Sequence, residues 1–229
     1  MSMLILATSD VHSPEYLPLY LDALRNTLTE PEVVLFAGDM VDKNKVLMFK
    51  RVYEATKRRF PSAPVIATFG NEEYRGYEKL YEQLFKDITW LNDSYTKLCE
   101  GELCIIGTRG GLDKPTTWQT RNIPGIEKYY IELPFKVEQM ALELRRAGCK
   151  KIILLSHYGV TRKNLIGEKQ EVYPYLASSR FERILRKELI DMVIHGHVHM
   201  GSLEVVHVRD VPVYNVSLPA RRKLVEVRI

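Results

Sequence analysis

Residues 3–12 of the chain read MLILATSDVH and join a short apolar run to two side chains of the kinds that bind metals. The run Met3–Ala7 (MLILA) has the length and composition of a strand buried on both faces. Asp10 and His12 follow it closely. Residues two apart at the frayed end of a strand can aim their side chains into one cavity. The segment therefore predicts a strand that ends at a ligand site.

The first half of the chain alternates short β-rich runs with helical patterns. Two further buried strands are predicted, over Glu32–Ala37 and Pro64–Phe69. Ser13 and Pro14 are typical of an N-cap and a first-turn proline, so a helix is expected from there to about Thr29. Two more helices are predicted, over Lys45–Arg59 and around Tyr77–Phe85. This alternation favours parallel strands joined by helical crossovers.

The second half is richer in strands. A hairpin is predicted first, then a helix, then two buried strands and finally an antiparallel meander. In chain order these are Tyr95–Cys99 with Leu103–Ile106, Val137–Ala147, Lys151–Leu155, Asp191–Ile194, and Leu203–Val208 with Val211–Val216 and Leu224–Val227. An α/β half joined to a β-rich half predicts two packed sheets flanked by helices. Without repeats or linkers, residues 1–229 are expected to form one domain.

The composition is that of an ordinary globular protein. Apolar residues make up 45% and charged residues 27%, and the net charge of +4 falls short of the basic stripe of a dedicated nucleic-acid binder. The apolar run at the N-terminus is too short for a signal peptide, and no stretch approaches the roughly 18–20 apolar residues of a membrane span. Cys99, Cys104 and Cys149 lack metal-site spacing and are expected to be reduced core thiols. The sequence thus predicts a cytoplasmic protein with no membrane partner.

Five short polar motifs come at the carboxyl ends of predicted strands, where α/β folds place ligand sites. Their carboxylates, imidazoles and single amide oxygen suit manganese, iron, zinc, cobalt or nickel. The motifs are Asp10-Val11-His12, Gly38-Asp39-Met40-Val41-Asp42, Gly70-Asn71-Glu72, Ser156-His157-Tyr158 and Gly196-His197-Val198-His199.

Each motif alone has a simpler structural explanation. Asp10 or Asp39 could cap a helix, Asn71 could occupy a turn, and His157 could be a hydrogen-bonded core histidine. The conjunction argues for a metal site, because four of the six histidines fall within these motifs, each after a predicted strand. The other two, His195 and His207, are expected to be structural.

In this order, the patterns D-x-H, G-D-x-x-D, G-N-x-E, S-H and G-H-x-H resemble the signature of the calcineurin-like metallophosphoesterases. The resemblance spans residues 10–199 and implies an α/β fold, a four-layer α/β/β/α sandwich of two mixed sheets flanked by helices. It also implies two divalent metal ions at the strand ends. One ion would be held by Asp10, His12 and His199, the other by Asn71, His157 and His197, and Asp39 would bridge them. Asp42 is expected to support its loop rather than to bind metal.

The resemblance further implies an enzyme, a metal-dependent phosphatase or phosphodiesterase. It would hydrolyse a phosphomonoester or phosphodiester, expected to be small, by attack of metal-bound hydroxide, with Asp39 and Asn71 as catalytic residues. Charge favours phosphate independently. Two divalent ions bring four positive charges and the two aspartates neutralise two, so a residual charge of roughly +2 needs an anion. Manganese is the first candidate for the metal, with iron, zinc, cobalt and nickel as alternatives.

Several positions depart from the family pattern or add to it. Many members carry a histidine after the G-N pair that is thought to protonate the leaving oxygen, and Glu72 stands there instead. A carboxylic acid could serve only if burial raised its pKa, and nearby metals act against this, so Glu72 is equally a turn residue. The segment Tyr158-Gly159-Val160 departs from the proline-containing version common in the family, and Tyr158 is a candidate substrate contact. Arg109 and Arg121, in a long loop, are further candidates, although solvated loop charge explains them as well.

Two other functions stay open at this point. One branch of the family cuts DNA, which allows a nuclease acting on DNA or RNA, although such enzymes usually add a capping domain. A non-catalytic scaffold with the same fold is the other alternative, and the complete set of ligands argues against it. Neither the substrate nor the oligomeric state follows from the sequence.

Overall fold

The computed structural model describes residues 3–229, and its first sheet is built around the strand that the opening apolar run forms. This strand, β1 (Leu4–Thr8), is buried along its whole length. The strand order is β11-β1-β2-β3-β4. Strands β1 to β4 run parallel, and β11 is antiparallel to β1. The other members are β2 (Val33–Ala37), β3 (Val65–Thr68), β4 (Ile88–Leu91) and β11 (Val225–Arg228).

The second sheet has six strands in the order β5-β6-β7-β8-β10-β9. Its central strands β6, β7, β8 and β10 are parallel, and the two outer strands β5 and β9 are antiparallel to their neighbours. Both sheets are therefore mixed, as predicted. The strands are β5 (Ser94–Leu98), β6 (Leu103–Thr108), β7 (Lys151–Ser156), β8 (Met192–His195), β9 (Val205–Val208) and β10 (Val211–Asn215).

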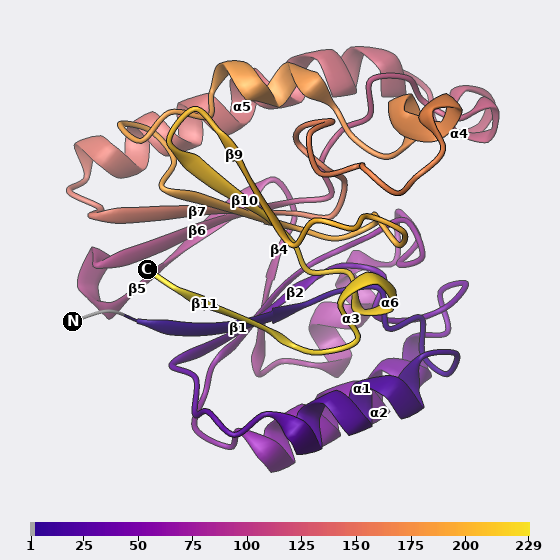
Figure 1. The fold of residues 1–229 in the computed structure, drawn as a ribbon, viewed down its shortest axis with the longest axis vertical. Helices are drawn as coiled ribbons and strands as arrows, with labels where there is room; N and C mark the ends of the chain where they lie inside the picture. The colour runs from indigo at the N-terminus through magenta and orange to yellow at the C-terminus, as the bar shows by residue number, and fades with distance from the viewer. Residues whose placement is uncertain (1–2) are drawn as a thin grey trace.

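The two sheets pack face to face, and helices cover both outer faces, which confirms the predicted four-layer α/β/β/α sandwich (Figure 1). The alternation of side chains along the strands explains this arrangement. Ile5 and Leu35 belong to the apolar cluster that includes Ile105 and Ile153 of the second sheet. The intervening Leu6 and Phe36 belong instead to the cluster formed with the helices on the first sheet.

The helices cover each sheet with an apolar face. Helices α1 (Leu17–Asn26), α2 (Val46–Arg59) and α3 (Glu78–Leu84) lie on the first sheet, and α5 (Ile126–Arg146) lies on the second. None of the helices in residues 3–229 is long and apolar enough to cross a membrane. Short elements complete the fold: α4 (Thr117–Asn122), α6 (Leu218–Arg221), and the 3-10 turns η1 (Cys99–Gly101), η2 (Gln170–Tyr175) and η3 (Ser179–Arg183).

The predicted C-terminal meander is wrong in its last strand. β9 and β10 form the expected antiparallel pair, but β11 does not continue it. The chain passes through α6 to the other sheet, where β11 pairs with β1. This pairing joins strands at opposite ends of the sequence, and the residues of β11 alternate in burial as they would in either sheet. Local pattern cannot decide between such partners.

Two helix boundaries also differ from the prediction. The first helix begins at Leu17, with Pro18 in its first turn, because Ser13 is bound to the loop after β2. The Ser13 N–H donates to Met40 O at 3.0 Å, and Ser13 O accepts from the Asp42 N–H at 3.2 Å. Helix α5 begins at Ile126, well before the predicted start. It contains a proline, Pro134, which would ordinarily argue for a helix boundary.

The prediction that all three cysteines are reduced core thiols is wrong. Cys104 on β6 and Cys149, just before β7, are joined by a disulfide, and Cys99 is an exposed free thiol. The two bonded residues are 45 positions apart in the sequence. They meet because β6 and β7 are neighbours in the second sheet. The pairing therefore depends on sheet topology, which cysteine spacing does not reveal.

The aromatic cluster beneath the first sheet is expected to be a main source of stability. Phe49 of α2 is fully buried, and its ring lies 4.7 Å from that of Phe85 and 5.3 Å from that of Trp90, centroid to centroid. Replacing Phe49 with alanine should lower the free energy of unfolding by about 3–5 kcal/mol, because it leaves a cavity among rings that cannot close over it. Urea denaturation measures the loss.

The matched control is Leu47→Ala on the same helix, where the side chain is 71% exposed. That variant should stay within roughly 0.5 kcal/mol of the parent protein. Equal losses in the two variants would contradict the assigned core.

Candidate metal centre

Seven polar side chains gather where strands of both sheets end. Asp10 and His12 follow β1, Asp39 follows β2, and Asn71 follows β3. From the second sheet, His157 follows β7, and the pair His197 and His199 follows β8. Parallel strands bring their carboxyl ends to one edge of a sheet, and the face-to-face packing brings the two edges together. The site lies at the end of the sheets opposite the two chain termini (Figure 1).

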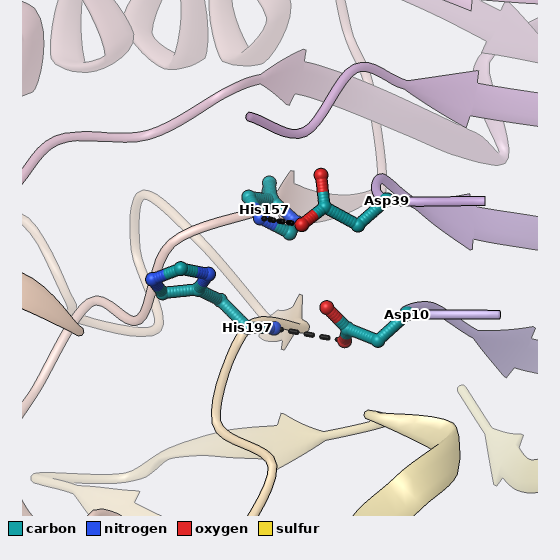
Figure 2. A group of neighbouring side chains, drawn as sticks. All are labelled: Asp10, Asp39, His157 and His197. Atoms are coloured by element: carbon teal, nitrogen blue, oxygen red, sulfur yellow. Dashed lines mark hydrogen bonds and ion pairs between the residues drawn. The ribbon is translucent and has the colours of Figure 1, made fainter. Parts of the chain in front are cut away.

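The backbone turns sharply at these strand ends. Asp10, His12, Asp39 and His197 all have positive φ angles, of 58°, 41°, 52° and 67°. Residues other than glycine seldom adopt this conformation, and such residues cluster at functional sites. Here the turns bring side chains that follow different strands toward one centre (Figure 2).

Two glycines allow the loops to approach closely. A Cβ atom on Gly70 would lie 2.1 Å from Asp39 Oδ1, and one on Gly38 would lie 2.8 Å from His157 Nδ1. Neither position can carry a side chain without moving the aspartate or histidine beside it. The glycines of the G-D and G-N motifs are therefore required by packing at the centre.

The first group of ligand-type atoms comes from Asp10, Asp39, His157 and His197, all within 4.8 Å of one another (Figure 2). His157 Nε2 lies 3.3 Å from Asp39 Oδ2 and 3.0 Å from Asn71 Oδ1. The structure thus places Asn71, His157 and His197 around Asp39. This is the set that the sequence predicted for one metal.

The second group comes from Asp10, His12 and His199, again within 4.8 Å. His199 Nε2 lies 3.1 Å from Asp10 Oδ1. His12 Nε2 lies 3.8 Å from both Asp10 Oδ1 and Asp39 Oδ2. Asp39 Oδ2 thus faces a histidine of each group, as expected for a bridging carboxylate. All seven predicted ligands are brought together in two adjoining groups.

One buried atom shows that these residues fit a cation. His12 Nε2 is buried and has no hydrogen-bond partner within residues 3–229. It faces two carboxylate oxygens at a distance too long for a hydrogen bond. A cation between them would coordinate all three atoms, and carboxylate and imidazole donors suit a divalent transition metal.

Without metal, the two histidines of the first group have opposite protonation. Burial lowers the pKa of His157, but the carboxylates of Asp39 and Asp10 outweigh burial and raise it to about 9. Burial, together with the neighbouring His157, lowers the pKa of His197 to about 3. Burial raises the pKa of Asp39, yet His157 outweighs this and holds it below its ordinary value. His157 is therefore charged and His197 neutral near neutral pH.

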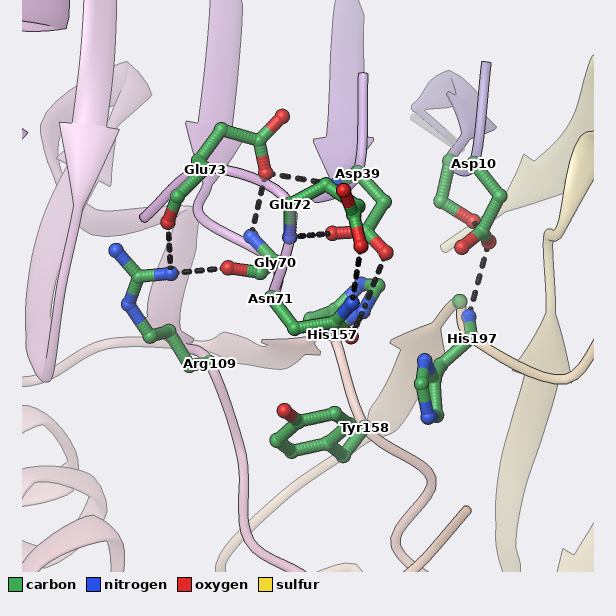
Figure 3. Close-up of polar contacts among 12 residues, drawn as sticks. Asp10, Asp39, Gly70, Asn71, Glu72, Glu73, Arg109, His157, Tyr158 and His197 are labelled. Carbon is green, nitrogen blue, oxygen red and sulfur yellow. Dashed lines mark hydrogen bonds and ion pairs between the residues drawn. The ribbon is translucent and has the colours of Figure 1, made fainter. Parts of the chain in front are cut away.

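Glu73 is a functional residue that the sequence analysis missed. It is 1% exposed, and its carboxylate accepts four backbone N–H groups, those of Asp39, Met40, Val41 and Gly70, at 2.7–3.3 Å (Figure 3). Burial and the nearby Asp39 raise its pKa, and the N–H bonds oppose the rise. Glu73 thus ties the loop that carries Asp39 to the loop that carries Asn71. In the sequence, the indication of this role was a second acidic residue directly after Glu72.

Glu72 itself is partly exposed and takes part in the same loop. Its backbone N–H donates to Asp39 Oδ1 at 2.7 Å, and its carboxylate accepts from the Lys43 N–H at 2.7 Å. The backbone of Glu72 thus orients the proposed bridging carboxylate, while its side chain closes a turn.

The three predicted substrate contacts have different positions. Arg109 is 3% exposed and is one of the residues that line the cavity beside the centre. It also supports the loop of Asn71, since its guanidinium donates to Gly70 O and Glu73 O (Figure 3). The same guanidinium pairs with Glu78. It is thus not part of an exposed basic rim. Arg121 is exposed on α4 and does not line the cavity beside the centre. Tyr158 does line it, with its ring centroid 4.7 Å from that of His197.

His195 is buried, as expected for a structural role. Its Nδ1 lies 2.9 Å from Gly196 O, and its Nε2 contacts the Asn164 side chain. Burial lowers the pKa of His195 to about 4, so the ring is neutral near neutral pH.

The sequence model described as calcineurin-like phosphoesterase matches residues 3–201. No curated protein resembles the chain closely enough in sequence to count as a match.

Solved structures share the fold at low sequence identity. A phosphopantetheinyl hydrolase from Mycobacterium tuberculosis has a TM-score of 0.66 at 14% identity, with 96% of this chain and 95% of that one covered. A calcineurin-like phosphoesterase from Bacillus subtilis has a TM-score of 0.54 at 15% identity, covering 93% and 80%. The NAD nucleotidase of Haemophilus influenzae has a TM-score of 0.59 at 18% identity, with 100% of this chain and 47% of that one covered.

Replacing Glu73 with glutamine should weaken the link between the two loops. The substitution turns one acceptor oxygen into a donor that faces backbone N–H groups, so the metal-free protein should lose about 1–3 kcal/mol of unfolding free energy. Affinity for Mn²⁺ should fall roughly 10- to 100-fold, as is typical when the support of ligands is lost. The adjacent Glu72→Gln, partly exposed, is the control. Equal effects of the two changes would remove the special role of Glu73.

Metal binding is expected to release protons. His157 has a pKa of about 9 in the metal-free protein, so it must lose a proton to become a ligand near neutral pH. Apparent Mn²⁺ affinity should therefore rise with pH until about pH 9. Calorimetric titration in buffers of different ionisation enthalpy counts the protons. An affinity independent of pH, with no proton released, would contradict this assignment.

Proposed function

The chain belongs to the calcineurin-like phosphoesterase family, and we propose that it is a hydrolase that cleaves a phosphate ester with two divalent metal ions. The observation that carries the proposal is the convergence of seven ligand-type side chains in two adjoining groups. Asp10 has atoms in both groups, and Asp39 faces a histidine of each.

We assign the ligands by these groups. Asp10, His12 and His199 would hold one ion, Asn71, His157 and His197 the other, and Asp39 both. When bound, two such ions lower the pKa of a shared water and hold oxygens of the phosphoryl group. We take manganese as the first candidate, because carboxylate, amide and imidazole donors suit it.

The charge of the centre supports an anionic substrate. Two divalent ions bring four positive charges, and Asp10 and Asp39 neutralise two. The carboxylate of Glu73 is turned to backbone N–H groups of the two loops and is committed there. An excess of roughly two positive charges therefore remains, and a phosphate ester balances it.

Water is the nucleophile that we assign to this site, because the serines next to Asp10, His12 and His157 have their hydroxyl groups engaged. Ser9 Oγ donates to Asp10 Oδ2 at 2.5 Å, and Ser156 Oγ donates to Tyr158 O at 2.7 Å. Ser13 Oγ donates to Met48 O at 3.2 Å. The free thiol of Cys99 is exposed at η1, at the amino-terminal end of β6 and so away from the centre. This arrangement supports direct hydrolysis without a covalent enzyme intermediate.

A small organic phosphate is the substrate class we propose. The similar structures include enzymes named for phosphopantetheinyl and NAD chemistry, which supports a small organic molecule over a polymer. A cavity of about 660 Å³ opens beside Asn71 and His197, and this is the size range of sites for small molecules.

Activity should require both metal and Asp39. In the metal-stripped protein reloaded with Mn²⁺, hydrolysis of 4-nitrophenyl phosphate or of bis(4-nitrophenyl) phosphate is expected. Asp39→Asn should lower kcat by roughly 100-fold or more, since the neutral amide lacks the negative charge that would hold both cations and several kcal/mol of charge stabilisation is lost. The preferred ester then separates phosphatase from phosphodiesterase.

Asp42→Asn is the matched control, because Asp42 lies in the same loop and pairs with Lys45 at 2.7 Å. It should keep most of the activity. Turnover without metal, or an undiminished Asp39→Asn variant, would overturn the proposal. If the protein retains no metal, the alternative of a non-catalytic scaffold is favoured instead.

A further inference from the structure

The cavity beside the metal centre is rich in aromatic side chains. Its inner end is lined by Asn71 and His197, which belong to the candidate centre. Aromatic rings make up six of its sixteen lining residues, against 10% of the whole chain. The rings are those of Tyr74, Tyr77, Trp118, Tyr130, Tyr158 and Tyr175.

Several of these rings are open to solvent at the mouth of the cavity. Trp118 is 65% exposed, and Tyr74 and Tyr77 are also exposed. They come from two separate segments, α4 and the stretch before α3. Exposed apolar surface gathered at one place marks a site that another group covers. Aromatic faces are best covered by another flat ring.

The wall that carries Trp118 is held firmly to the metal centre. Helix α4 begins with a capping box in which Thr116 and Gln119 bond each other's backbone N–H groups. Gln119 is buried, and its Nε2 donates to the Tyr158 hydroxyl at 3.2 Å. The Tyr158 ring in turn packs edge-on against His197 (Figure 3). A ligand anchored at the centre would thus meet Trp118 in a defined position.

The chemistry of the lining favours a heteroaromatic ring over an alkyl chain. Tyrosines present flat faces and hydroxyl groups together, so a ring with polar edges can stack and form hydrogen bonds at once. An alkyl chain would bring methylene groups against those hydroxyls and leave them without partners. The amide of Asn122 adds a further polar group at the wall.

We propose that this cavity holds the organic part of the substrate, and that this part carries a flat heteroaromatic ring, as a nucleoside does, stacked on Trp118. The proposal rests on the proposed phosphoesterase function, because the phosphate would lie at the metal centre. In the reaction, water oxygen bonds to phosphorus, the ester P–O bond breaks, and the leaving oxygen gains a proton. A nucleoside 5′-monophosphate and water thus give a nucleoside and phosphate.

The test compares substrates that differ only in the ring. The values of kcat/KM are measured with Mn²⁺ for AMP, GMP, CMP and UMP, and for ribose 5-phosphate, which lacks the base. The methyl esters of the same compounds serve if the enzyme prefers diesters. At least one nucleotide should exceed ribose 5-phosphate by roughly tenfold or more, the effect typical of one stacked base.

Variants assign the preference to Trp118. Trp118→Ala should lower kcat/KM for the preferred nucleotide by roughly tenfold and leave ribose 5-phosphate unchanged, while Trp118→Phe should recover most of the loss. Tyr95→Ala is the matched control, since Tyr95 is an exposed aromatic residue on β5 that does not line the cavity. It should change neither substrate.

A second readout does not depend on turnover. The chain has two tryptophans, and Trp90 lies in the aromatic core, so quenching of tryptophan fluorescence by a nucleoside reports stacking on Trp118. Quenching by the preferred nucleoside that is absent in Trp118→Ala supports the proposal even if no ester is hydrolysed. A lack of hydrolysis alone would contradict only the proposed phosphoesterase function. No quenching, equal kcat/KM for nucleotides and ribose 5-phosphate, or a preference for octyl phosphate over every nucleotide would overturn the inference.

Discussion

The packing of the two sheets against each other determines where every candidate ligand lies. Alternate residues of β1 and β2 face the second sheet, and their contact with residues of β6 and β7 buries apolar surface from both sides. This contact sets the carboxyl ends of β1, β2 and β3 opposite those of β7 and β8. Neither sheet alone holds more than part of the ligand set, so the centre exists only because the sheets stack in this register.

Three buried carboxylates then need compensation, because a buried charge without partners is costly. Glu73 is compensated by four backbone N–H groups. Asp10 Oδ2 accepts hydrogen bonds from the Ser9 hydroxyl and from the backbone N–H of His197, and its Oδ1 faces the histidines. Asp39 Oδ1 accepts a hydrogen bond from the backbone N–H of Glu72, and its Oδ2 faces His157. The oxygens that face the histidines are those on which a cation would act. Beside them, His12 Nε2 has no hydrogen-bond partner in the described part of the chain.

Solved structures share this fold at 14–18% identity, so the fold depends on the pattern of burial more than on particular residues. What differs within such a fold is the decoration of its loops. In this chain the stretch between β6 and α5 forms α4 and carries Trp118, and Tyr158 directly follows a predicted ligand. The wall of the cavity is therefore built in part by segments that follow strand ends, and under the proposed function these segments would contact a substrate.

Sequence patterns alone predicted the strands other than β4, most of the helices and the set of polar residues at the strand ends. Those features follow from local periodicity and from the position of Asp10, Asp39, Asn71 and His157 after apolar runs. Three features became visible only in the folded chain: β11 pairs with β1, Cys104 meets Cys149, and Arg109 and Glu73 are buried supports of the ligand loops. Each of these depends on which distant segments become neighbours. A pattern of a few residues does not show which distant segment will pack against it. The same alternation of buried and exposed residues suits a strand at any sheet edge. A charged side chain, likewise, can lie on the surface or be buried against backbone groups of a loop.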